Sequence, residues 1–174
     1  MKKIILLISA LYSLSTLNAI EVTNVTNKVA LNYGMVEHSD NKDDDILGIL
    51  SLSVGKDYYF DNNLFFSGNI NLGYNENNLD LSSDLKLGYT FLKDNKTGIN
   101  LYGTISPLIQ QRLLNNTYTD NSESAMGMGV GAGVEYNFEN KYCISANYIN
   151  YYMNGTTSSS YQYSKAFLTV GHAF

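Results

Sequence analysis

Apolar and polar residues alternate along most of the chain with a period of two. Between Met126 and Val134 every second residue is apolar, and every residue in between is glycine. In residues 79–91 leucine and aromatic residues occupy one parity, while polar residues such as Asp80 and Lys86 occupy the other. Because successive side chains of a β-strand point to opposite faces, this period predicts strands with one apolar and one polar face.

Eight segments of this kind follow one another along the chain. The expected strands are 28–38, 46–60, 64–75, 79–91, 97–112, 125–138, 142–153 and 161–174. The stretches 61–63, 93–96 and 139–141 are tight polar turns of the kind that join antiparallel neighbours. Neither a linker nor a shift in composition interrupts the succession, so we expect a single domain.

The alternation alone does not show which face meets water, because a soluble barrel also alternates, with its apolar face inward. Other features favour a lipid bilayer. The apolar face is nearly unbroken over five or six alternations per strand, which is the height of a hydrocarbon layer. Tight turns lie at one end of the strands, and longer connections lie at the other, apart from residues 76–78.

Aromatic residues gather at two levels, as they do at the two interfaces of a membrane. Those beside the tight turns are Tyr58, Phe60, Phe66, Tyr89, Phe91, Tyr136, Phe138, Tyr142 and Phe174. Those at the other end are Tyr74, Tyr152 and Tyr161. The longer connections at that end are residues 39–45, 114–124 and 154–160, and we expect them to form surface loops.

Lipid offers no hydrogen-bond partners, so every backbone group must be paired within the protein, and a closed barrel leaves no free strand edge. The sequence therefore predicts an all-β fold: an eight-stranded antiparallel up-and-down transmembrane β-barrel with a lipid-facing apolar exterior and a polar filled interior. In this fold the glycines of residues 127–133 face the lumen. They make room for bulky inward groups such as Tyr102 or Phe167, allow sharp wall curvature, or merely relieve crowding.

The first 19 residues have the layout of a secretory signal peptide. Lys2 and Lys3 form a basic start, and an apolar stretch interrupted by serines runs to Leu17. A transmembrane anchor is disfavoured because the uninterrupted apolar core is short. We therefore expect cleavage after Ala19, a short N-terminal segment over 20–27 and a barrel domain over 28–174.

Charge and cysteine content exclude two classes of protein. The chain carries 11 basic and 16 acidic residues, a net charge of −5, and loss of Lys2 and Lys3 takes it to −7. A basic patch for nucleic acid is therefore not expected. Cys143 is the single cysteine, so an internal disulfide is excluded.

Several charged residues have inward parity, namely Asp57, Asp84, Lys86, Glu135 and Lys165, with Arg112 as a further candidate. Opposite charges in a narrow interior would pair, because pairing offsets the cost of desolvation. We expect a lumen network that acts as a structural plug. The alternative is a narrow ion path, which needs space that an eight-stranded barrel rarely leaves.

His38, with Ser39 and Asp40 beside it, raises the alternative of a hydrolytic or acyl-transfer site. Neighbouring residues of an extended strand point to opposite faces, so the three cannot align without a bend. His172, the other histidine, lies at the opposite end of the strands. We therefore expect His38 to be a solvated loop residue and predict no catalytic residues.

Asp40, Asp43, Asp44 and Asp45 form an acidic run in the first long connection. Hard oxygen ligands suit calcium, but the run lacks the glycine and the distal glutamate of a calcium loop. A solvated loop tip, bridged to lipopolysaccharide phosphates by divalent ions, is the favoured interpretation. We predict neither a metal site nor a cofactor.

The last strand ends in YSKAFLTVGHAF over residues 163–174. With the signal peptide and the eight amphipathic strands, it resembles the small eight-stranded outer-membrane β-barrels of Gram-negative bacteria, such as the OmpA transmembrane domain and OmpX. In that class the terminal aromatic residue and alternate apolar residues form a signal for the barrel-assembly machinery. Leu168, Val170 and Phe174 match this signal, and His172 departs from it.

The resemblance implies a non-enzymatic protein of the cell outer membrane with a role in envelope integrity or adhesion through its surface loops. A lipid A-modifying enzyme, either an acyl hydrolase or an acyltransferase, and a small porin-like channel are the alternatives. The implied partners are outer-membrane lipid and lipopolysaccharide, the barrel-assembly machinery, and a host or envelope protein. We expect a monomer that binds no nucleic acid.

Overall fold

The structure is a computed structural model that describes residues 21–40, 43–76, 78–91, 97–112, 124–139, 141–155 and 160–174. The expected signal peptide lies outside the described residues. Within these ranges, no helix has the length and the apolar character needed to cross a membrane.

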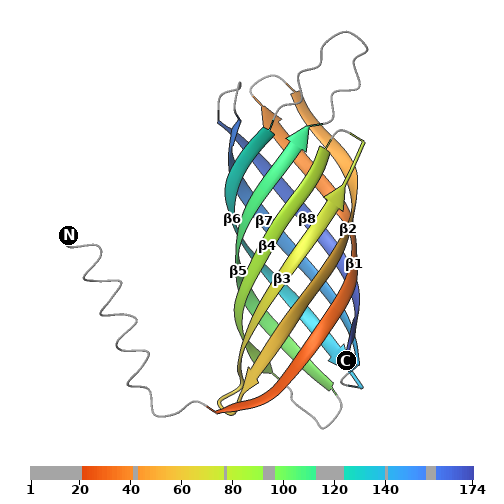
Figure 1. Ribbon diagram of the computed structural model, residues 1–174, viewed down its shortest axis with the longest axis vertical. Helices are drawn as coiled ribbons and strands as arrows, with labels where there is room; N and C mark the ends of the chain where they lie inside the picture. The colour runs from red at the N-terminus through yellow and green to blue at the C-terminus, as the bar shows by residue number, and fades with distance from the viewer. Residues whose placement is uncertain are drawn as a thin grey trace, which may run out of the picture.

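Eight strands account for almost all of the described residues. They are β1 (Val22–Asp40), β2 (Asp43–Phe60), β3 (Leu64–Tyr74), β4 (Asn78–Phe91), β5 (Thr97–Arg112), β6 (Ser124–Phe138), β7 (Tyr142–Gly155) and β8 (Tyr161–Ala173). Each strand pairs antiparallel with the next, and β8 pairs with β1, so the sheet closes into a barrel (Figure 1). The predicted fold class is confirmed.

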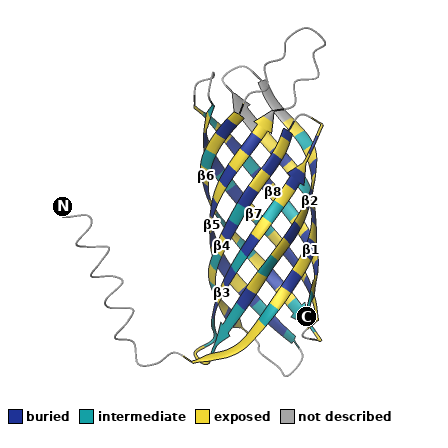
Figure 2. Ribbon diagram, in the orientation of Figure 1, coloured by how far each residue is buried: buried dark blue, intermediate teal, exposed yellow. Residues whose placement is uncertain are grey.

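The barrel is apolar outside and polar inside. Buried and exposed residues alternate along every strand (Figure 2). The outward side chains are predominantly large and apolar, as at Leu87 (63% exposed), whereas inward polar residues such as Asn100 (0%) are shut off from the surface. This arrangement inverts that of a soluble protein and suits a wall in contact with hydrocarbon.

The two ends of the barrel differ, and we name them by their connections. The turn end carries the β2–β3, β4–β5 and β6–β7 connections, and both the start of β1 and the end of β8 lie there (Figure 1). Asn63 in the β2–β3 turn has a φ of 64°, a left-handed conformation that asparagine tolerates well. The loop end carries the other four connections.

Two strand ends lie outside the expected bounds. β1 begins at Val22 rather than at residue 28, so most of the expected N-terminal segment 20–27 is part of the barrel. A register shift between Val22 and Asn24 interrupts the period of two, which hides this start in the sequence. At the loop end, the ladder pairs Asp40 with Asp43, so all but residues 41–42 of the expected loop 39–45 belong to strands.

The glycines of β6 provide space for side chains of the neighbouring strands. A methyl group added to Gly129 would lie 2.6 Å from Cδ1 of Tyr151, and one added to Gly133 would lie 2.5 Å from Cζ of Tyr102. No glycine in the described ranges has a positive φ, so backbone freedom is not the reason for these glycines. Room for Tyr102 is confirmed, whereas Phe167 lies against Gly34 on β1 instead.

Aromatic rings follow the rim of the turn end. A chain of neighbouring rings, with centroids 5.2–6.2 Å apart, runs across β6, β7 and the end of β8. Its members are Tyr136, Phe138, Tyr142, His172 and Phe174. The His172 imidazole thus takes the place of an aromatic ring in the belt.

The expectation for Tyr161 was wrong. Its hydroxyl donates a hydrogen bond to Oε1 of Gln110 at 2.7 Å, so the side chain turns into the lumen rather than toward the outer belt. Its odd parity on β8, shared with the buried Tyr163 and Lys165, explains the direction.

Candidate functional site: the lumen

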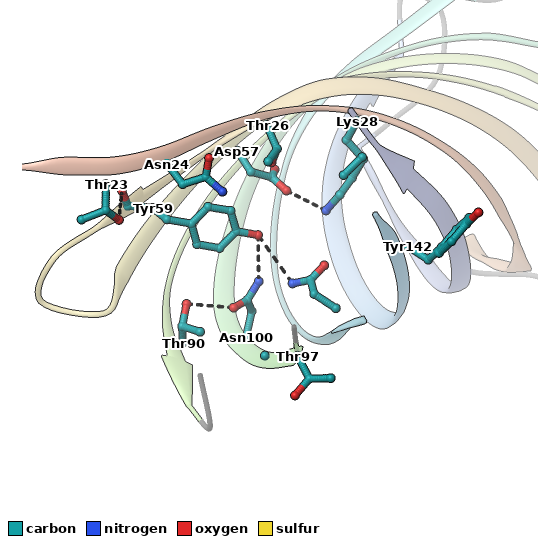
Figure 3. Close-up of a pocket in the computed structure, with 13 residues that line it drawn as sticks. Thr23, Asn24, Thr26, Lys28, Asp57, Tyr59, Thr90, Thr97, Asn100 and Tyr142 are labelled. Carbon is teal, nitrogen blue, oxygen red and sulfur yellow. Dashed lines mark hydrogen bonds and ion pairs between the residues drawn. The ribbon is translucent and has the colours of Figure 1, made fainter. Parts of the chain in front are cut away.

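A cavity of about 370 Å³ occupies the turn end of the lumen. It is lined by Thr23, Asn24, Thr26, Lys28, Asp57, Tyr59, Thr90, Thr97, Gly98, Asn100, Asn137, Tyr142 and Ala173 (Figure 3). The lining residues come from β1, β2, β4, β5, β6, β7 and β8. The cavity therefore depends on closure of the barrel and is not the product of one hairpin.

An ion cluster lies beside this cavity. Nζ of Lys28 lies 2.7 Å from Oδ2 of Asp57 and 2.8 Å from Oε2 of Glu135. All three side chains are buried, and each carboxylate offsets part of the desolvation cost of the lysine. The two acids and one base leave the cluster with one negative charge.

Hydrogen bonds made by uncharged side chains extend the cluster across the lumen. Asn100 donates to Oε1 of Glu135 at 3.3 Å and accepts a hydrogen bond from Thr90 at 2.9 Å. The Tyr59 hydroxyl accepts from the side-chain amides of Asn100 and Asn137, each at 3.5 Å (Figure 3). These contacts connect β1 and β2 to strands on the opposite wall.

The middle of the lumen is nearly full. A void of about 10 Å³ lies among polar residues that include Asn32, Asn71 and Asp84, which is space for about one water molecule. Nζ of Lys86 lies 4.8 Å from the centroid of the Tyr102 ring, a cation–π distance.

Asp80 is the centre of a second ion cluster, toward the loop end. Its Oδ2 lies 2.8 Å from Nζ of Lys165 and accepts a hydrogen bond from Tyr163 at 2.7 Å. Its Oδ1 accepts a hydrogen bond from Gln110 at 3.0 Å. Both carboxylate oxygens therefore have protein donors, which is the usual condition for a buried charge.

An apolar cluster fills the lumen around these residues. It consists of Val36, Ile49, Leu108, Ala125, Ile149, Tyr151, Met153 and Tyr163, with Leu47, Tyr161 and Phe167 packed against it. The interior is thus polar toward the turn end and partly apolar toward the loop end, a division that the strand pattern did not indicate. Among the described residues, such packing leaves little space for water in the loop-end half.

The structure turns the five predicted lumen charges inward, but it does not bring them into one network. Asp57 and Glu135 meet at Lys28, and Lys165 meets Asp80. Asp84 instead accepts a hydrogen bond from Ser106 at 2.6 Å, and Lys86 makes a cation–π contact with Tyr102.

Sequence reasoning did not single out Lys28 or Asp80 as lumen charges. Asp80 shares the parity of Asp84 in the same strand, so the signal was present. Lys28 stood at the expected start of its strand, where parity carries little weight. Extending the alternation of β1 back from Asn32 would have identified it.

The other predicted residues lie on the outside of the barrel or have side chains that the structure does not describe. Leu168, Val170 and Phe174 are exposed along β8 and its end. The remaining predicted residues have their backbones at strand ends, and nothing is described of their side chains. They are Arg112, His38, Asp40, Asp43, Asp44 and Asp45. Among the side chains that are described, no group of three or more His, Cys, Asp or Glu could hold a metal ion.

Comparison with known proteins agrees with this architecture. The family model described as outer membrane protein beta-barrel domain matches residues 4–174. No curated protein matches the chain.

Several solved structures share the fold at low sequence identity. Neisserial surface protein A has a TM-score of 0.62 at 17% identity, covering 87% of this chain and 99% of that chain. Ail, the attachment invasion locus protein of Yersinia pestis, has a TM-score of 0.55 at 13% identity, covering 87% of this chain and 100% of that chain. The N-terminal β-barrel domain of Pseudomonas aeruginosa OprF has 0.53 at 16%, also covering 87% and 100%. The chain belongs to the outer membrane protein beta-barrel domain family and is a protein of the bacterial outer membrane.

Proposed function

We propose that the protein supports the integrity of the outer membrane and mediates surface interactions through its loop end, which faces the outside of the cell. The observation that carries this proposal is the packing of the loop-end half of the lumen, where, among the described residues, an apolar cluster surrounds an ion cluster whose carboxylate oxygens all have donors. Activity at the cell surface is then left to the connections, because loops carry function on rigid scaffolds.

The charge of the connections indicates the chemistry of the partner. Residues 39–45, which comprise the β1–β2 connection at 41–42 and the strand ends beside it, contain four aspartates and one lysine, a charge of −3. Residues 114–124 contain Asp120 and Glu123, a charge of −2. Acidic loops suit a basic protein surface, or lipopolysaccharide phosphates bridged by divalent cations.

Two structural neighbours have names that refer to surface roles. One is a Neisserial surface protein, and Ail is an attachment invasion locus protein that has been crystallised with a heparin analogue, sucrose octasulfate. These names support an adhesion-type role for this chain. The polyanionic ligand does not carry over, because the acidic connections would repel it.

The test of the surface role is to replace Asp40, Asp43, Asp44 and Asp45 with asparagine. Cells with this variant should take up a hydrophobic dye faster and adhere less to a basic surface, because divalent bridges and charge complementarity are lost. Alanine at residues 156–159, four neutral residues between β7 and β8 at the same end, is the matched control. Unchanged permeability and adhesion in the aspartate variant would contradict the proposal.

The channel alternative has its own test. In the described part of the lumen, a void of only about 10 Å³ at the middle and an apolar cluster beyond it disfavour a continuous aqueous path. We expect the purified barrel to give no steady unitary conductance in planar bilayers. A stable conductance that ends on Lys165→Met substitution would favour the channel instead.

The enzyme alternative concerns His38, whose side chain lies outside the described residues. His172 stacks in the outer aromatic rim against Tyr142 and Phe174. We propose that the protein is not an enzyme. Incubation with lipid A followed by mass spectrometry should show no change of its acyl chains, and His38-dependent loss or gain of an acyl chain would contradict this.

We also propose that Leu168, Val170 and Phe174 form the signal for the barrel-assembly machinery. They lie exposed on one face of the strand that closes the barrel onto β1. Phe174→Ala should lower the amount of assembled protein in the outer membrane, measured by the gel mobility of unheated samples. Tyr152→Ala, another exposed aromatic change away from the C-terminus, is the control. Equal assembly of the Phe174 variant and the unmodified protein would contradict this role.

A further inference from the structure

The cavity at the turn end opens toward the periplasm in the orientation that such barrels adopt. Its volume of about 370 Å³ lies in the range of small-molecule sites. Seven of its 13 lining residues have neutral hydrogen-bonding side chains, namely Thr23, Thr26, Thr90, Thr97, Asn24, Asn100 and Asn137. A dense array of hydroxyl and amide groups suits a molecule that both donates and accepts many hydrogen bonds.

Asp57 lines the cavity and has a buried acceptor atom that no described residue satisfies. The residue is 1% exposed, and its Oδ2 contacts Lys28, but its Oδ1 has no partner among the described residues. A buried carboxylate oxygen without a donor is costly. Hydroxyls of Tyr102, Thr104 and Ser145 also lack a partner, but these residues do not line the cavity.

Tyr59 offers a ring and a donor on the same wall. Its ring stacks with Phe65 at a centroid distance of 6.0 Å, which holds it in place. Its hydroxyl accepts two long hydrogen bonds and donates to no protein acceptor within the described lumen. Oδ1 of Asp57 is shut off from the cavity as the side chain stands. A rotation of the carboxylate toward the cavity would let a ligand donate a hydrogen bond to Asp57 while it accepts one from Tyr59.

The charges restrict the ligand. Asp57 and Glu135 flank Lys28, and Lys86, stacked on Tyr102, is the further cation near this cluster. With Lys86 included the cluster is neutral, but the unsatisfied atom is a carboxylate oxygen. An anionic ligand would meet that oxygen unfavourably. We propose that the cavity binds a polyhydroxylated molecule of monosaccharide size without negative charge, held by Asp57 and Tyr59.

The first test measures binding of three sugars that differ in charge. The mature barrel in detergent micelles would be studied by saturation-transfer NMR with glucose, glucosamine and glucuronate. Glucose and glucosamine should bind with Kd values of about 1 mM to 10 mM. Glucuronate should bind at least about tenfold more weakly. Absence of transfer to glucose and glucosamine at about 50 mM would mean that the cavity holds water only and would overturn the proposal, as would equal binding of glucuronate.

The second test assigns the binding to the cavity. Asp57→Asn and Tyr59→Phe should each weaken glucose binding by about threefold to tenfold, the loss of one hydrogen bond. Asn71→Ala, in the mid-lumen void, is the matched control and should not change binding. Gel mobility of unheated samples verifies folding of each variant.

The assignment does not depend on one variant. If Asp57→Asn fails to fold, Tyr59→Phe and Thr26→Val decide the matter, because both residues line the cavity. Unchanged binding in these variants, or an equal loss in Asn71→Ala, would overturn the proposal.

Discussion

Asp57 and Asp80 look alike in isolation but differ in their surroundings. Each is 1% exposed, and each contacts a buried lysine at 2.7 Å to 2.8 Å. Asp80 accepts two further hydrogen bonds, from Tyr163 and Gln110, so both of its oxygens have donors. Asp57 has Lys28 alone, and its second oxygen has no partner among the described residues.

The difference follows from the two halves of the lumen. Around Asp80 an apolar cluster leaves little space for water, and the protein itself supplies donors to both carboxylate oxygens. Beside Asp57 lies a cavity of about 370 Å³, where a ligand or solvent can supply the missing donor. The same residue type is therefore structural in the filled half and available for binding in the open half.

The largest expected effect comes from truncating the two aspartates. Asp80→Ala should lower the free energy of unfolding by about 3–5 kcal/mol, because it leaves Lys165 buried without its partner. Asp57→Ala should cost about 1–2 kcal/mol, because Lys28 keeps Glu135. Urea unfolding in lipid vesicles, monitored by gel mobility, measures both. A cost for Asp57→Ala that equals or exceeds that of Asp80→Ala would break the comparison.

A smaller effect is expected from adding one methyl group to each half. Gly129→Ala would place that group 2.6 Å from Tyr151 and should cost about 1–3 kcal/mol, the range for overpacking. Gly98→Ala, in the cavity wall, meets its nearest atom at 3.4 Å and should change stability by less than about 0.5 kcal/mol. The same unfolding assay applies, and equal costs would mean that the halves are packed alike.

The smallest effect is expected from removing one hydroxyl in each half. Tyr163→Phe loses a 2.7 Å hydrogen bond to Asp80 in a dry environment and should cost about 1–2 kcal/mol. Tyr59→Phe loses two 3.5 Å contacts beside the cavity and should cost less than about 0.5 kcal/mol. If Tyr59→Phe proves the more destabilising variant in urea unfolding, the cavity wall is more rigidly built than the geometry indicates.

The sequence could predict which side chains of the site face the lumen, because strand parity sets their direction. The period of two placed Asp57, Asp84, Lys86, Glu135 and Lys165 inside, because side-chain direction in a strand is a local property. It failed where that period breaks, at the register shift after Val22, and where a residue of inward parity is apolar. Val36, Ile49 and Leu108 all have inward parity, and their clustering was not anticipated.

The sequence by itself determined the strands, their apolar and polar faces and the outer-membrane fold, because each of these depends on residues close together in the chain. Only the tertiary structure decided which inward groups meet. Lys28 and Glu135 are 107 residues apart, and their contact across the lumen depends on the tilt and stagger of a closed barrel. For the same reason, of two inward-facing aspartates, Asp80 has donors to both oxygens in one half, and Asp57 has an oxygen without a described partner in the other.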